Sequence, residues 1–269
     1  MPKRACVRLL LVPLLFVSLS LLPGRSAFAQ DRTFSPQLFH PAPGPGEFVD
    51  VESPVPLGHK SWGFGFFLNY ARNELELAGF DTTTMRPTGA RADLIANALS
   101  ADLWAAVGLW NRFQIALALP MTLYQMGDDF DDTSMGRGAH VGAPSGFALG
   151  DPRIHLKVRL YGKERGFQIA LSHWLSIPLG NDSEFGGEKH FSGFAGEPRL
   201  LLGWEGGRWR AAAFAGFLWR AHSSSFFSTV AGQQLTYGGA GAFDAVPGRL
   251  TLIAELYGHS NSFDSVRTA

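Results

Sequence analysis

The sequence predicts an all-β protein, an antiparallel up-and-down transmembrane β-barrel with about nine strands present of about twelve. Three observations predict this class. Apolar residues alternate with small or polar ones, short turns alternate with long loops, and aromatic residues stand near the ends of the alternating segments. After residue 29, no stretch has the roughly 18 uncharged apolar residues that a spanning helix needs.

Residues 1–29 have the pattern of a secretory signal peptide. A basic start is followed by an apolar run from Leu9 to Leu22 and by the small residues Ala27 and Ala29. This is the order of a cleavable export signal, and the run is too short for a lasting membrane helix. We expect cleavage between Ala29 and Gln30 and export to the cell outer membrane.

The remaining composition narrows the class of protein. Cys6 is the single cysteine and lies in the signal, so the mature chain has neither a disulfide nor a cysteine-ligated metal site. Four of the 23 basic residues also lie there, and their removal leaves 19 basic against 23 acidic residues. A nucleic-acid-binding protein is expected to carry a basic stripe, and the sequence has none.

Residues 30–60 are rich in proline and glycine. Proline fixes the backbone and removes a hydrogen-bond donor, so this run does not suit the interior of a sheet. We interpret it as an irregular periplasmic strap. The chain then divides into a signal peptide (1–29), the strap (30–60) and an outer-membrane barrel (61–269).

The period of two begins at Trp62, and the run from Ile154 to Leu160 shows it most clearly. There, apolar residues alternate with charged ones, which a helix would scatter around its axis and a strand places on one face. In the segment from Phe113, the pattern places Tyr124 on the less apolar face with Gln114. The predicted strands lie near 62–70, 93–107, 113–126, 147–160, 167–179, 194–204, 209–220, 233–244 and 249–257.

The connections alternate in length. Short turns are expected at Leu109–Arg112, Gly162–Gly166, Glu205–Arg208 and Ala245–Gly248, and long polar loops near 71–92, 127–146, 180–193 and 221–232. Outer-membrane barrels have short periplasmic turns and long external loops. A soluble β-sandwich would not be expected to alternate short turns with long loops in this way.

The two faces of the predicted strands favour lipid over water outside the barrel. The less apolar face is mostly Gly, Ala and Ser, which solubilises poorly but packs well inside a narrow barrel. The apolar face ends in aromatic side chains, which prefer the headgroup level of a membrane. The expected lipid-interface aromatics are Trp62, Tyr70, Trp104, Trp110, Trp204, Trp209 and Trp219.

Several motifs resemble known families. Phe39-His40-Pro41-Ala42-Pro43-Gly44-Pro45, followed by Gly58-His59, Trp62 and Phe67-Leu68-Asn69-Tyr70-Ala71, is similar to the start of the barrel domain in OmpA-family envelope proteins of myxobacteria and related deltaproteobacteria. Gly108-Leu109-Trp110-Asn111-Arg112-Phe113 and Gly150-Asp151-Pro152-Arg153-Ile154 resemble segments of transporter-like outer-membrane proteins. The resemblance implies an outer-membrane barrel. In the OmpA family, acidic repeats and a peptidoglycan-binding domain often follow the barrel, and because this sequence contains neither, peptidoglycan anchoring is not carried over.

Nine strands is an odd number. Single-chain bacterial barrels have an even number, and an unpaired edge in lipid leaves backbone groups without partners. We therefore expect the chain to be C-terminally incomplete and to belong to a barrel of about 12 strands.

Charged side chains on the less apolar face are the candidate functional residues. They are expected either to line a pore and set its ion preference or to pair with each other as structural filling of the lumen. A barrel of about 12 strands lies between plugged and open sizes, and we favour structural pairing. The lumen-lining candidates are Asp102, Asp151, Arg153, His155, Lys157, Arg159, Glu197, Arg199, Arg210 and Glu255.

No enzyme or cofactor interpretation is supported. The acidic run 128–132 lacks the glycine turn and distal Glu of a calcium loop, so a solvated loop near lipopolysaccharide cations is favoured, and no metal site is expected. Ser172 and His173 are adjacent and would face opposite sides of a strand, which prevents a nucleophile–base pair. No catalytic residue is assigned.

Two functions are compatible with this sequence. The first is porin-like or transporter-like passage of small solutes. The alternative is an envelope anchor, whose barrel carries a periplasmic OmpA-type module absent from this chain. A periplasmic lipid-binding barrel is a third class. Expected partners are outer-membrane lipid, lipopolysaccharide and the barrel-assembly machinery, without nucleic acid. In a lipid-facing strand, Leu156→Arg should cost about 2–4 kcal/mol, and Lys157→Leu is expected to be far milder.

Overall fold

The computed structural model describes residues 39–81, 86–132, 139–141, 143–144, 146–181, 193–226 and 229–260. The expected signal peptide and its cleavage site lie outside the described residues, as does most of the loop expected near 180–193. No described residue belongs to a helix long and apolar enough to cross a membrane.

The described residues form an all-β structure. Its strands are β1 (Trp62–Asp81), β2 (Arg86–Leu109), β3 (Phe113–Met126), β4 (Phe130–Asp132), β5 (Ala139–Val141), β6 (Ala148–Leu149), β7 (Arg153–Tyr161), β8 (Gly166–Ser176), β9 (Ala195–Gly206), β10 (Trp209–Arg220), β11 (Ser224–Phe226), β12 (Thr229–Ala231), β13 (Gln234–Val246) and β14 (Leu250–His259).

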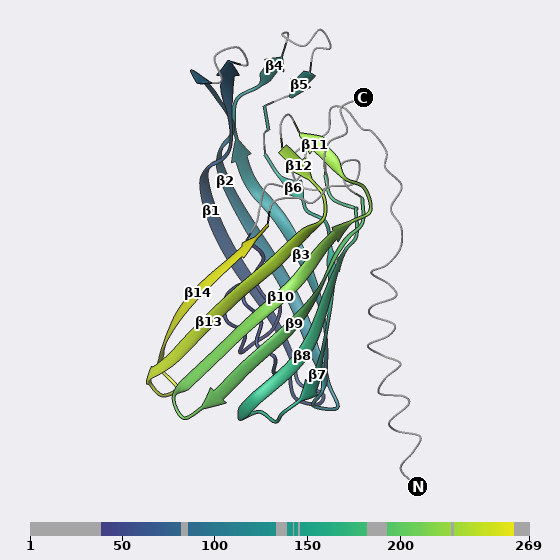
Figure 1. Cartoon of the computed structure of the whole chain (residues 1–269), viewed down its shortest axis with the longest axis vertical. Coiled ribbons are helices and arrows are strands. Elements are labelled where there is room, and N and C mark those ends of the chain that lie inside the picture. The colour runs from purple at the N-terminus through teal and green to yellow at the C-terminus, as the bar shows by residue number, and fades with distance from the viewer. Residues whose placement is uncertain are drawn as a thin grey trace.

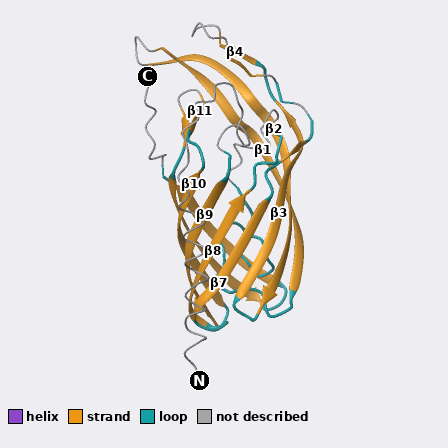
Figure 2. Cartoon of the chain, turned by 90° about the vertical axis from the view of Figure 1, so that its right-hand side faces the viewer, coloured by secondary structure: helices purple, strands orange, loops and turns teal. Residues whose placement is uncertain are grey.

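The main sheet is antiparallel and follows the chain in the order β1-β2-β3-β7-β8-β9-β10-β13-β14, with β6 added against β3. It curls into a half-barrel, with β1 and β14 as its two edges and strands that run obliquely (Figures 1 and 2). The all-β class, the antiparallel arrangement and the nine-strand path predicted from the period of two are therefore confirmed. Pairing between β1 and β14 is not found among the described residues.

The connections at the two ends of the sheet differ in length. Tight turns join β2 to β3, β7 to β8, β9 to β10 and β13 to β14, as predicted. At the other end, the hairpins β4–β5 and β11–β12 lie within two of the long connections (Figure 1). We call these ends the short-turn end and the long-loop end.

The prediction of a long loop near 71–92 is wrong. β1 and β2 continue as a paired hairpin as far as Asp81 and Arg86, with irregular register near Arg72 and Leu75. Cross-strand pairing satisfies the backbone whatever the polarity of the side chains. The polar composition of this stretch therefore concealed two strands.

Local irregularities modify two of the predicted strands. The strand expected at 147–160 is divided into β6 and β7 around Pro152, which has no N–H to give to a ladder. In β3, a bulge opposite the step from Leu99 to Ser100 shifts the register by one residue. Tyr124 therefore lies on the outer face and is half exposed, contrary to the predicted alternation, which the bulge inverts.

The curl of the sheet encloses residues 39–57, which we call the inner segment (Figure 1). We call the sheet face that contacts this segment the inner face. Phe48 and Val51 of the segment pack in a buried apolar cluster on strands β8, β9, β10 and β13, with Ala170, Leu201, Ala212, Phe214 and Ala242. The small residues on the inner face thus leave room for a stretch of irregular chain, a packing that the proline pattern did not predict.

Two glycines show how closely the segment approaches the sheet. A Cβ on Gly203 of β9 would lie 2.4 Å from the Pro54 ring, and a Cβ on Gly108 of β2 would lie 2.3 Å from the backbone oxygen of Leu57. Real Cβ atoms do not approach other atoms so closely, so the sheet carries glycine where the preceding chain crosses it.

Gly203→Ala should therefore destabilise the fold by about 1–3 kcal/mol, because the rigid Pro54 ring has to move. Gly241→Ala is the matched control, since a Cβ there meets nothing within 4 Å. The measurement is the free energy of unfolding in denaturant. Equal stability of the two variants would show that the inner segment does not pack against β9.

Candidate functional site

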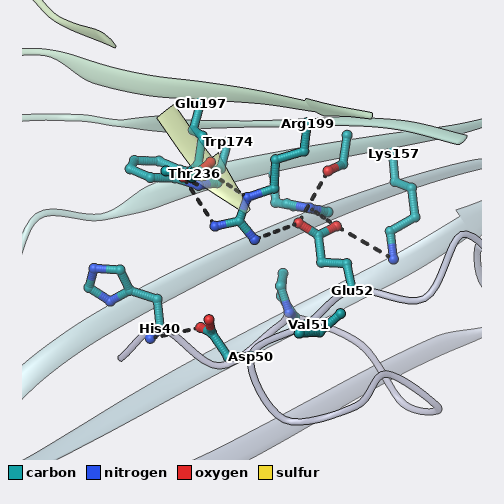
Figure 3. A network of polar contacts seen from close by, with 12 residues as sticks. His40, Asp50, Val51, Glu52, Lys157, Trp174, Glu197, Arg199 and Thr236 are labelled. Carbon is teal, nitrogen blue, oxygen red and sulfur yellow. Dashed lines mark hydrogen bonds and ion pairs between the residues drawn. The ribbon is translucent and has the colours of Figure 1, made fainter. Parts of the chain in front are cut away.

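Glu52 of the inner segment is the centre of a buried polar network (Figure 3). Its side chain is 2% exposed. One carboxylate oxygen lies 2.8 Å from His155 Nε2 and 3.7 Å from Lys157 Nζ. The other accepts a hydrogen bond from Ser172 Oγ at 3.1 Å and lies 3.4 Å from an Arg199 guanidinium nitrogen. Both oxygens are therefore held by donors of the sheet.

The register of the sheet positions these donors. Lys157 of β7 pairs with Ser172 of β8, and Ser172 pairs with Arg199 of β9, so the three residues form one row across three strands. Adjacent strands place paired side chains on the same face. His155 lies two residues before Lys157 and so shares its face. The donor set is consequently built by the backbone pairing of the sheet.

The inner segment is attached to the sheet at further points. Lys157 also forms an ion pair with Glu47. The Glu255 carboxylate on β14 accepts hydrogen bonds from the backbone N–H groups of Val49, Asp50 and Val51. Four strands separate β7 from β14 in the sheet, so these contacts tie the segment to two distant parts of the curl.

The structure brings most of the predicted lumen-lining charges onto the inner face. Asp102 forms an ion pair with Arg153 at 3.1 Å, and Glu197 forms one with Arg199 at 2.6 Å. Other candidates bind backbone groups. Asp151 accepts a hydrogen bond from the Gly180 N–H, and the Arg159 and Arg210 side chains donate to the carbonyl oxygens of Asn111 and Gly46. Within the described part of the chain, each of the ten candidates thus has a partner, but only these two ion pairs join candidates to each other. The other six bind backbone groups or the inner segment.

Burial and neighbouring cations set the charge of the segment's acids. Burial alone would raise the pKa of the Glu52 carboxyl, but His155, Lys157 and Arg199 outweigh it and hold that pKa well below its usual range. Burial raises the pKa of the Asp50 carboxyl to about 6, although Arg199 and the His40 N–H oppose the shift. At neutral pH, Glu52 is therefore an anion facing a cationic wall.

A cavity of about 150 Å³ adjoins this network. Its lining includes His40 and Asp50 from the segment and Arg153, Arg199 and Arg220 from the sheet. The cavity also reaches Gln234 and His259, which lie at the long-loop ends of β13 and β14. Within the described part of the chain, no three His, Asp or Glu side chains are grouped so as to hold a metal ion.

The predicted interface aromatics divide into two groups. Five are exposed on the outer surface: Trp62, Tyr70, Trp110, Trp204 and Trp209. Trp104 lies instead on the inner face, because the register pairs it with Gly65, whose missing Cβ leaves space for the indole. Trp219 belongs to the outer face by register but is 7% exposed, since its indole packs over Gly196 on β9. Neither of these two meets the expectation of an exposed rim residue.

The sequence interpretation missed the acids of the inner segment. Glu47, Asp50 and Glu52 lie in a run that was set apart as a strap because of its prolines. A signal was present: the segment has three acids and no Lys or Arg, whereas the strand from Arg153 to Arg159 carries a row of basic residues without an acid. Complementary charge on a strap and on a strand of the barrel indicates contact between them.

No known protein family, curated protein or solved structure matches the chain. The fold and the site therefore define the class of the protein by themselves. It is an all-β protein with a barrel-like antiparallel sheet and a charged interior that its own N-terminal segment occupies.

The site revises the expectation for Lys157→Leu. Lys157 is 1% exposed and is paired with Glu47 and Glu52, so its removal leaves two buried carboxylates without their shared cation. We expect a loss of about 3–5 kcal/mol in the free energy of unfolding. Lys163→Leu, in the exposed turn between β7 and β8, is the control and should change little. A mild effect at position 157 would contradict the observed network.

Proposed function

We propose that the chain is an outer-membrane β-barrel protein whose strands span the bilayer and whose lumen passes small solutes. The observation that carries the proposal is the polarity of the sheet. Large apolar side chains point outward along its strands, for example Phe64 (76% exposed), Leu117 (55%) and Leu256 (78%). The buried charges lie on the inner face, which is the reverse of a soluble barrel.

The outer apolar surface is too extensive for a protein in water. It runs over strands from both edges of the sheet and includes Phe66, Leu68, Leu200, Leu202 and Leu252, each at least 40% exposed. Monomeric soluble proteins rarely expose contiguous apolar patches above a few hundred Å². Lipid tails remove this cost because they need no hydrogen bonds.

The exposed aromatics support a membrane of defined thickness. Trp62, Trp110, Trp204 and Trp209 lie near the short-turn end, whereas Tyr70, Tyr124 and Tyr237 lie toward the long-loop end. Trp62 and Tyr70 are eight residues apart on β1, or about 26 Å along the strand at about 3.3 Å per residue. A strand tilt of about 35–45° reduces this to about 19–22 Å across the membrane, somewhat less than the apolar band of about 25 Å between two aromatic girdles.

Within the described part of the chain, β1 and β14 are edge strands with a single partner strand each, and this bears on the size of the barrel. Unpaired strand edges are unfavourable in hydrocarbon, since each free N–H or C=O costs several kcal/mol. A barrel of about 12 strands, completed by further strands, remains our prediction. Contacts with lipopolysaccharide and with the barrel-assembly machinery are part of the same proposal.

One observation favours the alternative of an envelope anchor. The inner segment lies within the curl and is tied to β14 and β7, so it occupies the interior through which a solute would pass. Passage requires the segment to move, whereas an anchor does not. Both functions require a sheet that spans the membrane, but only passage predicts that the protein conducts ions across a bilayer.

The substitution Leu200→Arg tests whether the outer face of the sheet lies in the membrane. Leu200 is in the middle of β9 on the outer face and is 44% exposed. In hydrocarbon the substitution should destabilise the protein by about 2–4 kcal/mol, whereas an exposed leucine in water tolerates it within about 0.5 kcal/mol. The measurement is the free energy of unfolding from liposomes, with Leu200→Met as the apolar control. A nearly neutral Leu200→Arg would overturn the membrane location.

Single-channel recording in planar bilayers tests passage. The full chain should give infrequent conductance steps, and Glu255→Gln should make them frequent, because it weakens the acceptor for three N–H groups of the segment. Asp244→Asn, an acid near the short-turn end of β13, is the control and should behave like the unmodified chain. If no variant conducts, the anchor replaces passage as the proposed function.

A further inference from the structure

The basic residues of the inner face differ in where they find carboxylates. Arg153 and Arg199 each have an acid on the sheet itself, Asp102 and Glu197. Among the ion pairs of the described residues, Lys157 has acids only on the inner segment, Glu47 and Glu52. Without the segment, the wall would therefore retain an ammonium group that has lost the acids with which it forms ion pairs.

The wall around Lys157 has the form of a receptor for a carboxylate. Ser172 and Arg199 face one oxygen of the Glu52 carboxylate, while His155 and Lys157 face the other. Charge-assisted contacts to both oxygens of a planar anion are the usual means of carboxylate recognition. These donors stand in register on β7, β8 and β9, so their arrangement comes from the sheet rather than from the segment.

We propose that His155, Lys157, Ser172 and Arg199 form an anion-binding site of the lumen wall, which the chain's own Glu52 occupies, and that small carboxylate solutes bind there when the inner segment moves aside. The inference rests on the proposed passage function and names its solute class. The segment acts as an internal competitor: it closes the lumen with the same chemical group that the solute presents.

The neighbouring cavity provides access to this site. It shares Arg199 with the site and extends toward the long-loop ends of β13 and β14. Trp174 and Tyr257 also line it, so it offers aromatic surface beside the guanidinium groups. A solute with a carboxylate and a small apolar or hydroxyl-bearing body therefore meets suitable surface before it reaches Lys157. The depressed pKa of Glu52 agrees with a wall that stabilises the anionic form of a bound carboxyl group.

Chemical rescue tests the site directly. Glu52→Ala removes the carboxylate and leaves a space in which acetate, the same group detached from the chain, can bind. In detergent micelles, acetate at about ten times its dissociation constant should raise the ratio of folded to unfolded Glu52→Ala about tenfold relative to chloride at equal ionic strength. The unmodified chain should show no such acetate effect, because Glu52 already fills the site.

Two comparisons make the test specific. Acetamide, which is neutral and of similar size, should not rescue Glu52→Ala, and acetate should not rescue Glu52→Ala combined with Lys157→Met. If Glu52→Ala does not fold in chloride, the refolded fraction in acetate against chloride becomes the measurement. Equal stability in acetate and chloride would overturn the site, and rescue by phosphate but not by acetate would overturn the carboxylate assignment.

This outcome is separable from that of the function. Rescue is measured as folding in detergent and does not depend on conductance. Acetate rescue in a chain that never conducts would keep the anion site and overturn passage. Conductance without rescue by acetate would support the proposed passage of solutes and overturn the proposed carboxylate site.

Discussion

The main sheet has an apolar outer face and an inner face that carries buried charges beside small and apolar side chains. Side chains alternate across a strand, so a sequence that alternates leucine with lysine or arginine has to separate two media. In a flat sheet, the side chains of the charged face would have no enclosed interior in which to find partners. By curling, the sheet exposes its apolar face outward and collects its charges in an interior where they find partners.

The buried charges of the interior must then balance one another. Buried cations are tolerated when carboxylates and other hydrogen-bond acceptors surround them, and Lys157 depends on the inner segment for its acids. This explains why a proline-rich stretch without regular structure is ordered within the sheet. Its acids face cations, its N–H groups bind Glu255, and its apolar residues Phe48 and Val51 pack against alanines. The side chains of the inner face are small and leave the space that the inner segment fills.

The strands and tight turns could be predicted from the sequence because both depend on local patterns. The period of two and the short turns identified all nine strands of the main path. Features that depend on register could not be predicted in this way. The bulge that turns Tyr124 outward, the pairing that puts Trp104 opposite Gly65, and the contact of Trp219 with Gly196 all require knowledge of which residues pair. Most of the candidate charges lie on the inner face. Their acidic partners on the inner segment are distant in sequence and lie in a run without periodicity.

The central claim is that the outer face contacts lipid tails. The most direct measurement places a nitroxide label on Leu117→Cys, in the middle of the exposed face of β3, and compares its collisions with oxygen and with a polar nickel chelate in liposomes. The account predicts that oxygen, which concentrates in hydrocarbon, collides more often than the chelate. A label that the chelate reaches more readily than oxygen would show that this face meets water.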